Sequence, residues 1–226
     1  MIRAIITLVW TDLALERASL ERVLTMAFFG FFCAVLFHFT LFFDESVLAS
    51  VATGGLWAVF FFAATLGAGR SFAAEKEHGA GDALLLAPVP SEAVYVGKTL
   101  ANFIFIFLTQ ALVWGAFSLM FPAGFLGKRG AALGMPTMWM AMALGAFGLA
   151  ALGTLVSAIS VHARRREMLF PVLFFPLALP IAMLGAQGWE AALAGGDVAY
   201  YLRLLAACVT LYFASGWILF EHVTRE

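Results

Sequence analysis

The chain has 226 residues, of which 63% are hydrophobic and only 12% charged, and its formal net charge is −1. Soluble domains carry about 25% charged residues, so this composition excludes an ordinary soluble fold and predicts a protein that crosses a membrane several times. Cys33 and Cys208 lie far apart in apolar runs, which excludes a disulfide framework, a zinc site and a CxxCH haem attachment. We expect the lipid bilayer, and no nucleic acid, as a partner.

The segment before the first long apolar stretch, residues 1–22, is predicted to form a helix on the membrane surface. Its apolar residues recur at helical spacing on one face, with three polar residues off that face: Ile2, Ile5, Ile6, Val9 and Leu13 against Arg3, Thr7 and Asp12. Trp10 would then lie at the level of the lipid headgroups. A cytosolic helix packed against the protein itself is the alternative. The segment lacks the pattern of a removable signal peptide.

Six segments are long and apolar enough to cross the hydrocarbon core, which takes about 20 helical residues. They are residues 23–43, 47–69, 99–121, 135–161, 168–188 and 204–220, and the last can begin as early as residue 200. Together with the preceding helix they predict an all-α membrane protein, with residues 1–226 as a single transmembrane domain.

The basic residues indicate how these spans are oriented. Ten of the thirteen fall on one side of the predicted topology and three on the other: Arg3, Arg17, Arg22, Arg70, Lys76, Lys98, Arg164, Arg165, Arg166 and Arg225 against Lys128, Arg129 and Arg203. Lys and Arg accumulate in cytoplasmic segments. We therefore predict that both termini and residues 70–98 are cytoplasmic.

The predicted spans contain no Asp, Glu, Lys or Arg, and their strongest polar groups include His38, Asn102 and Gln110. Ion-coupled carriers and pumps keep charged residues in their spans, so neither is expected here. The chain also lacks the GxxxxGK[ST] string that surrounds ATP phosphates. We expect no catalytic residues, and any ATP hydrolysis must be performed by a partner chain.

The histidines do not predict a metal or haem site. His38 is expected to be buried near the outer end of the first span and hydrogen-bonded to a neighbouring helix. His78, His162 and His222 are in or beside cytoplasmic segments, where solvation is the simplest interpretation. No second histidine is placed to pair with His38.

Two spans carry patterns that predict their packing. Ala141, Gly145 and Gly148 fall on one face of the fourth span, which favours close approach of other helices. The fifth span contains three prolines, Pro171, Pro176 and Pro180, which predict a kinked or locally unwound helix. A mechanical role in opening a substrate path and ordinary membrane-helix proline content are both open interpretations.

The stretch EKEHGAGDALLLAPVPSEAVYVGK, residues 75–98, is the longest polar interruption in the middle of the chain. Residues 82–87 can form about one and a half turns of helix before Pro88 stops it. A helix this short is not stable alone and must dock onto something. Its leucines form an apolar surface on the cytoplasmic side, which indicates a partner site or a membrane-surface patch.

These residues resemble the signature of type-2 ABC exporter membrane subunits, Glu-x-x-x-Gly-x-x-acidic-x-Leu-Leu-x-x-Pro followed by Gly-Lys. The matching positions are Glu75, Gly79, Asp82, Leu84, Leu85, Pro88, Gly97 and Lys98. Within that class, GGLWAVFFFAATLGAGRSFAAE, LLLAPVP and FFPLALPIAML resemble the CcmB (heme exporter protein B) family, the membrane subunit of the cytochrome c maturation ABC transporter. Gly81 departs from the leucine that is common there.

The resemblance implies that residues 75–88 form a coupling helix docked in a groove of a separate ATP-binding subunit, through Glu75, Glu77, Gly79, Asp82, Leu84, Leu85 and Pro88. It implies a bacterial inner-membrane complex with a haem-handling membrane protein, a small single-span protein, a periplasmic haem chaperone and a possible second copy of this chain. Haem would be cargo rather than an intrinsic cofactor, and ATP would be bound by the partner.

Two other functions stay open at this point. One is ABC export of a lipid or glycan. The other is a mechanical or assembly subunit whose ATP-driven motion releases a loaded haem chaperone without passing haem through the spans. The lack of charged residues in the predicted spans is compatible with this release and with transport of a flat apolar molecule.

Overall fold

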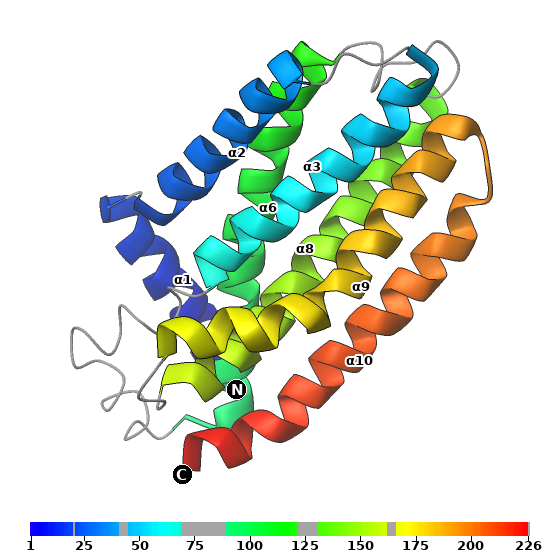
Figure 1. The fold of residues 1–226 in the computed structure, drawn as a ribbon. Helices are drawn as coiled ribbons and strands as arrows, with labels where there is room; N and C mark the ends of the chain where they lie inside the picture. The colour runs from blue at the N-terminus through cyan, green and yellow to red at the C-terminus, as the bar shows by residue number, and fades with distance from the viewer. Residues whose placement is uncertain (20, 41–44, 69–88, 122–130, 162–165, 226) are drawn as a thin grey trace.

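The structure, a computed structural model, describes residues 1–19, 21–40, 45–68, 89–121, 131–161 and 166–225 (Figure 1). Within these ranges the chain forms helices and no strands. The helices are α1 (Ile2–Ser19), α2 (Glu21–Thr40), α3 (Glu45–Ala68), α6 (Ser91–Met120), α8 (Ala131–Val161), α9 (Arg166–Ala194) and α10 (Val198–Arg225).

Six of these helices, all except α1, are long and apolar enough to cross a membrane. The predicted all-α membrane fold, with six spanning helices after a first helix, is therefore confirmed. Several helices extend beyond the predicted spans: α6 begins at Ser91 rather than near residue 99, α8 begins at Ala131, α9 continues to Ala194, and α10 runs from Val198 to Arg225. A helix can continue through polar residues near these ends, because neighbouring helices or water at the membrane surface can hydrogen-bond to their side chains.

The helix α8 forms the centre of the bundle. It contacts α3, α6, α9 and α10, and 78% of its most apolar stretch is buried inside the protein. By contrast, α2 packs on α3 and α6 at the edge, where only 17% of its span is buried. The apolar side chains on the outside of α2 therefore face the lipid.

Both termini lie at the same end of the bundle in Figure 1, which we call the terminal end. At this end α3 and α8 finish and α6 and α9 begin, whereas α2, α6 and α9 finish at the far end (Figure 1). An even number of spans returns the chain to the side on which it started. The alternating direction of successive helices therefore agrees with the topology that the charges predict.

Glycines allow α3, α8 and α9 to pack closely. The indole of Trp57 on α3 is inserted between Gly145 of α8 and Gly185 of α9, where added Cβ atoms would collide with its ring. Gly148 faces Val209 and Ile181, and a Cβ there would lie only 2.7 and 2.9 Å from their side chains. The small-residue face predicted in the fourth span thus meets helices on two sides, and Ala141 is buried beside it.

The three prolines of α9 do not interrupt it, because the helix is continuous from Arg166 to Ala194. The ribbon bends instead: the first part of α9, drawn in yellow, runs at a steep angle to the later, orange part (Figure 1). Prolines bend helices because they remove a donor and clash with the preceding turn. The Tyr212 hydroxyl of α10 donates a hydrogen bond of 2.6 Å to the Leu177 carbonyl, which fastens the bent region to α10.

Candidate functional site: the junction at the start of α6

The first turns of α6 contact α1, α8 and α10, and we call this region the α6 junction: Tyr95, Gly97, Lys98 and Asn102 with Asp12 of α1. It lies at the terminal end of the bundle, directly after residues 75–88 in the chain. Those residues, including all the predicted coupling positions from Glu75 to Pro88, lie outside the described part of the structure. Gly97 and Lys98, the end of the same signature, lie within α6.

Lys98 is paired with Asp12 across the α1–α6 interface. Its Nζ donates to both carboxylate oxygens of Asp12, at 2.9 and 3.0 Å. The Lys98 side chain is only 2% exposed and that of Asp12 17% exposed. A buried ammonium requires a compensating charge, so this contact fixes where α1 lies along α6.

Gly97 brings the two backbones together beside this ion pair. A Cβ at position 97 would lie 3.0 Å from the Cβ of Leu8 and 3.6 Å from the carbonyl oxygen of Ile5. The glycine of the signature therefore has a packing role here, because it admits α1 closely enough for Asp12 to reach Lys98.

Tyr95 joins α6 to α8 and α10. It is fully buried, and its hydroxyl donates to the carbonyl of Ala151 at 3.2 Å. Its ring packs against Phe213 and Phe220, with centroids 5.6 and 5.4 Å away. Gly216 leaves room for the hydroxyl, since a Cβ there would collide with it.

Asn102 adds a polar contact two turns further along α6. Its Nδ2 donates to Thr154 Oγ1 at 2.9 Å, and this hydroxyl donates in turn to the Ala150 carbonyl at 2.8 Å. Both side chains are buried. Such bonds between membrane helices contribute about 0.6–2 kcal/mol each, so they hold α6 against the central helix α8.

The α6 junction therefore connects the start of α6 to three other helices. A displacement of the preceding segment would move α6 together with α1 and would press directly on α8 and α10, because packed helices move as units.

The structure corrects two predictions about polar residues. Lys98 was assigned to the segment outside the span, but α6 begins earlier and buries it within the bundle. His38 was expected to be buried; it is exposed and makes edge contacts with Phe39 and Phe121, with centroids 5.4 and 5.6 Å away. His38 is exposed because α2 lies at the edge of the bundle, where only 17% of its span is buried.

Metal-binding clusters are absent from the described residues, where no three His, Cys, Asp or Glu side chains come together. Gln110 is buried in α6, and neither its Nε2 nor its Oε1 has a hydrogen-bond partner within the described part of the chain. An unpaired buried amide is costly in a membrane protein. In this respect Gln110 differs from Asn102, whose amide donates a hydrogen bond to Thr154.

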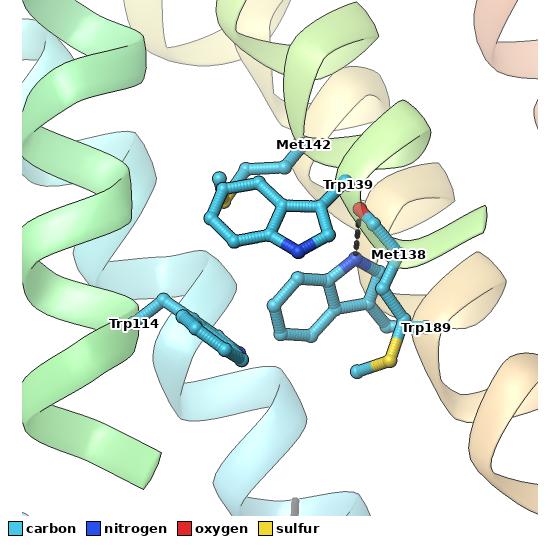
Figure 2. A pocket seen from close by; sticks show the side chains of 5 residues that line it. All are labelled: Trp114, Met138, Trp139, Met142 and Trp189. Atoms are coloured by element: carbon cyan, nitrogen blue, oxygen red, sulfur yellow. Dashed lines mark hydrogen bonds between the residues drawn. The ribbon is translucent and has the colours of Figure 1, made fainter. Parts of the chain in front are cut away.

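A second feature lies at the far end, where Figure 2 shows a small pocket between α6, α8 and α9. It is lined by Trp114, Met138, Trp139, Met142 and Trp189. The indole N–H of Trp189 donates to the Met138 carbonyl at 2.9 Å. The cavity volume is about 10 Å³, roughly the space that one water molecule needs, so the pocket does not enclose a small-molecule ligand.

Sequence reasoning did not predict either the Asp12–Lys98 pair or the tryptophan pocket. The one signal for the ion pair was an acidic residue lying off the apolar face of the first helix. Three tryptophans at positions 114, 139 and 189 carry no local pattern that places them together.

Comparison with known proteins decides the family. Residues 3–215 match the family model described as CcmB protein, which covers nearly the whole chain. The chain belongs to the CcmB protein family.

Curated CcmB relatives are consistent with this match. The proteins named heme exporter protein B from Rhodobacter capsulatus, Paracoccus denitrificans and Pseudomonas aeruginosa are 33%, 32% and 27% identical to this chain over 146, 184 and 197 residues. These alignments cover 62%, 81% and 87% of this chain and 62%, 81% and 85% of the relatives. The chain therefore spans less than two thirds of the Rhodobacter protein and most of the other two.

Proposed function

We propose that this chain is the membrane subunit of an ATP-driven ABC transporter that acts in haem export for c-type cytochrome biogenesis. The CcmB family match carries the proposal, supported by curated relatives that are named heme exporter protein B. ATP is hydrolysed by a separate subunit. That subunit docks on residues 75–88, and both chain termini face the cytoplasm in a bacterial inner membrane.

The α6 junction supports the coupling part of this proposal. Residues 75–88 precede α6 directly, and α6 is joined to α1 by the Lys98–Asp12 pair and to α8 by the Tyr95 and Asn102 hydrogen bonds. Closure of the ATPase subunits would push on the start of α6 and thereby on the central helix. Haem-handling and chaperone proteins of the same system would receive the haem that this motion delivers.

The docking step is tested by replacing Leu84 and Leu85 with aspartate. We expect the tagged variant to insert in the membrane normally but to lose co-purification of the ATPase, because charges replace the apolar surface. Replacing Leu119, an 85% exposed residue near the end of α6, with aspartate is the matched control. Co-purification of the ATPase at wild-type level with the Leu84 and Leu85 variant would contradict the proposal.

The transport step requires a separate measurement. Vesicles that contain only this chain and its ATPase should move haem when ATP is supplied, and a Walker-site variant of the ATPase should not. If ATP is hydrolysed but haem does not move, the subunit performs the mechanical release of a haem chaperone instead. Loss of c-type cytochromes after gene disruption is expected for both mechanisms and does not separate them.

A further inference from the structure

The two halves of α9 are held in the bundle by different kinds of contact. In the half nearer the far end, the indole N–H of Trp189 donates to the Met138 carbonyl of α8 at 2.9 Å. In the same half, Gly185 lies against the indole ring of Trp57 from α3, and a Cβ there would collide with that ring. A hydrogen bond and interlocked shapes therefore fix this half of α9 to α3 and α8.

The half of α9 nearer the terminal end, residues 168–175, contains only apolar side chains. Phe174 is fully buried, and its ring centroid lies 6.2 Å from that of Phe61 on α3. The ring of Phe175 lies 5.3 and 5.9 Å from those of Phe61 and Phe62. Such contacts resist separation weakly in a bilayer, because lipid chains are as apolar as the side chains that they replace.

Pro176 and Pro180 lie between the two halves, in the region where the ribbon of α9 turns (Figure 1). Neither proline has a backbone N–H, so the carbonyls four residues earlier, at Val172 and Pro176, receive no helical hydrogen bond. The middle of α9 therefore lacks two of the hydrogen bonds that stiffen an ordinary helix.

Tyr212 of α10 contacts this weakened region directly. Its hydroxyl donates to the Leu177 carbonyl at 2.6 Å, and Leu177 lies between the two prolines in the chain. The hydrocarbon core offers no donor that could replace this hydrogen bond. Breaking it is therefore costlier than separating one apolar side chain from another and exposing both to lipid.

We propose that α9 is a hinged gate for which Tyr212 is the latch. The terminal half, residues 168–175, pivots about Pro176 and Pro180 and separates from α3 at Phe175, while the far half stays fixed. Lipid replaces the phenylalanine contacts, so the hydrogen bond to Leu177 decides how often the seam between α3 and α9 opens. This inference goes beyond the proposed function, because it concerns how the subunit moves and does not depend on its cargo.

Electron paramagnetic resonance distances between pairs of spin labels test the hinge. The full chain, with any co-purifying ATPase, is studied in lipid nanodiscs after its two native cysteines have been replaced by alanine. Val172→Cys with Ile159→Cys measures the terminal half of α9 against α8, and Met183→Cys with Met140→Cys measures the far half against the same helix. These side chains are 66%, 37%, 52% and 49% exposed, so labels at all four positions can point outward.

Tyr212→Phe removes the latch hydroxyl and keeps the ring. We expect it to raise the proportion of the open position about threefold to twentyfold, the effect of one hydrogen bond between membrane helices. The terminal pair should gain longer distances and the far pair should not change. Thr210→Val is the matched control, because the Thr210 hydroxyl donates within α10, to the Ala206 carbonyl. An unchanged terminal pair, or equal broadening of both pairs, would overturn the inference.

Restoring the missing backbone donors tests the hinge separately from the latch. In a chain with Pro176→Ala and Pro180→Ala, α9 should be stiffer, so adding Tyr212→Phe should no longer lengthen the distances of the terminal pair. Pro171→Ala, which lies outside the bend, should leave the effect of Tyr212→Phe intact. The far pair shows in each variant whether the fold is retained. Equal lengthening with and without the two prolines would show that no hinge is present.

Failure of this inference is distinguishable from failure of the proposed function. The label distances require neither ATP nor haem, so a rigid α9 would overturn the gate and leave the proposed function standing. Loss of the ATPase from the wild-type complex would contradict the proposed function, and the distances would still decide whether α9 is hinged.

Discussion

The ammonium group of Lys98 and the carboxylate of Asp12 meet at 2.9 and 3.0 Å although 86 positions separate them in the chain. The contact joins the first helix to the first spanning turns of α6. It places a charge pair where the apolar composition gives no reason to expect one. The pair is therefore a sensitive point at which to test whether α1 and α6 act as one unit.

Replacing Asp12 with alanine should destabilise the protein by about 3–5 kcal/mol, because the buried Lys98 loses a compensating charge. The double variant Asp12→Ala with Lys98→Met should recover most of this loss, since neither charge remains. Thermal unfolding of the wild type, the single variants Asp12→Ala and Lys98→Met, and the double variant in detergent gives the coupling energy. Arg3→Gln, which removes an exposed charge from the same helix, is the control. Additive losses in the double variant would show that the two residues are independent.

The insertion of Trp57 between two glycines should make their substitution costly. Gly185→Ala places a methyl group against the indole ring, and overpacking of this kind costs about 1–3 kcal/mol. Trp57→Phe in the same chain should restore part of the stability by making room. Gly115→Ala is the matched control, because nothing lies within 4 Å of a Cβ at that position. Unfolding temperatures of the four proteins provide the comparison.

The apolar outer face of α1 should lie in the membrane interface. Ile5 and Val9 are half-buried against the protein, whereas Ile2, Ile6 and Trp10 are 75%, 62% and 71% exposed. α1 therefore has both a protein-facing and an outward apolar side, which combines the two interpretations of the sequence. An outward apolar strip of this kind inserts at the headgroup boundary.

Cysteine labelling tests this placement in a chain whose Cys33 and Cys208 have been replaced. Ile6→Cys should react slowly with a membrane-impermeant maleimide in inverted vesicles, because lipid covers it. The neighbouring Thr7→Cys is exposed on the polar side and should react rapidly. Equal reactivity of both positions would mean that α1 is surrounded by water.

Both termini should be protected from protease added outside intact cells. Figure 1 places them at one end of the bundle, and the distribution of Lys and Arg predicts that this end is cytoplasmic. A tag at either terminus should be cleaved only after the cells are opened. Cleavage of either tag in intact cells would reverse the proposed orientation.

Sequence reasoning succeeded where the signal is local. Apolar runs identified all six spans, and the errors were confined to helix ends such as the start of α6, where polar residues continue the helix. It failed for His38, because burial depends on which neighbours cover a side chain and not on how apolar its own segment is.

The sequence alone determined the membrane class, the number of spans, the expected orientation and the resemblance to a family, because hydrophobicity, charge placement and motifs are properties of contiguous residues. Only the tertiary structure decided that Asp12 neutralises Lys98, that Trp57 fits between Gly145 and Gly185, and that the Tyr95 hydroxyl donates to the Ala151 carbonyl. Those relationships depend on how helices rotate and approach in the bundle, which side-chain packing fixes only when all the helices are present.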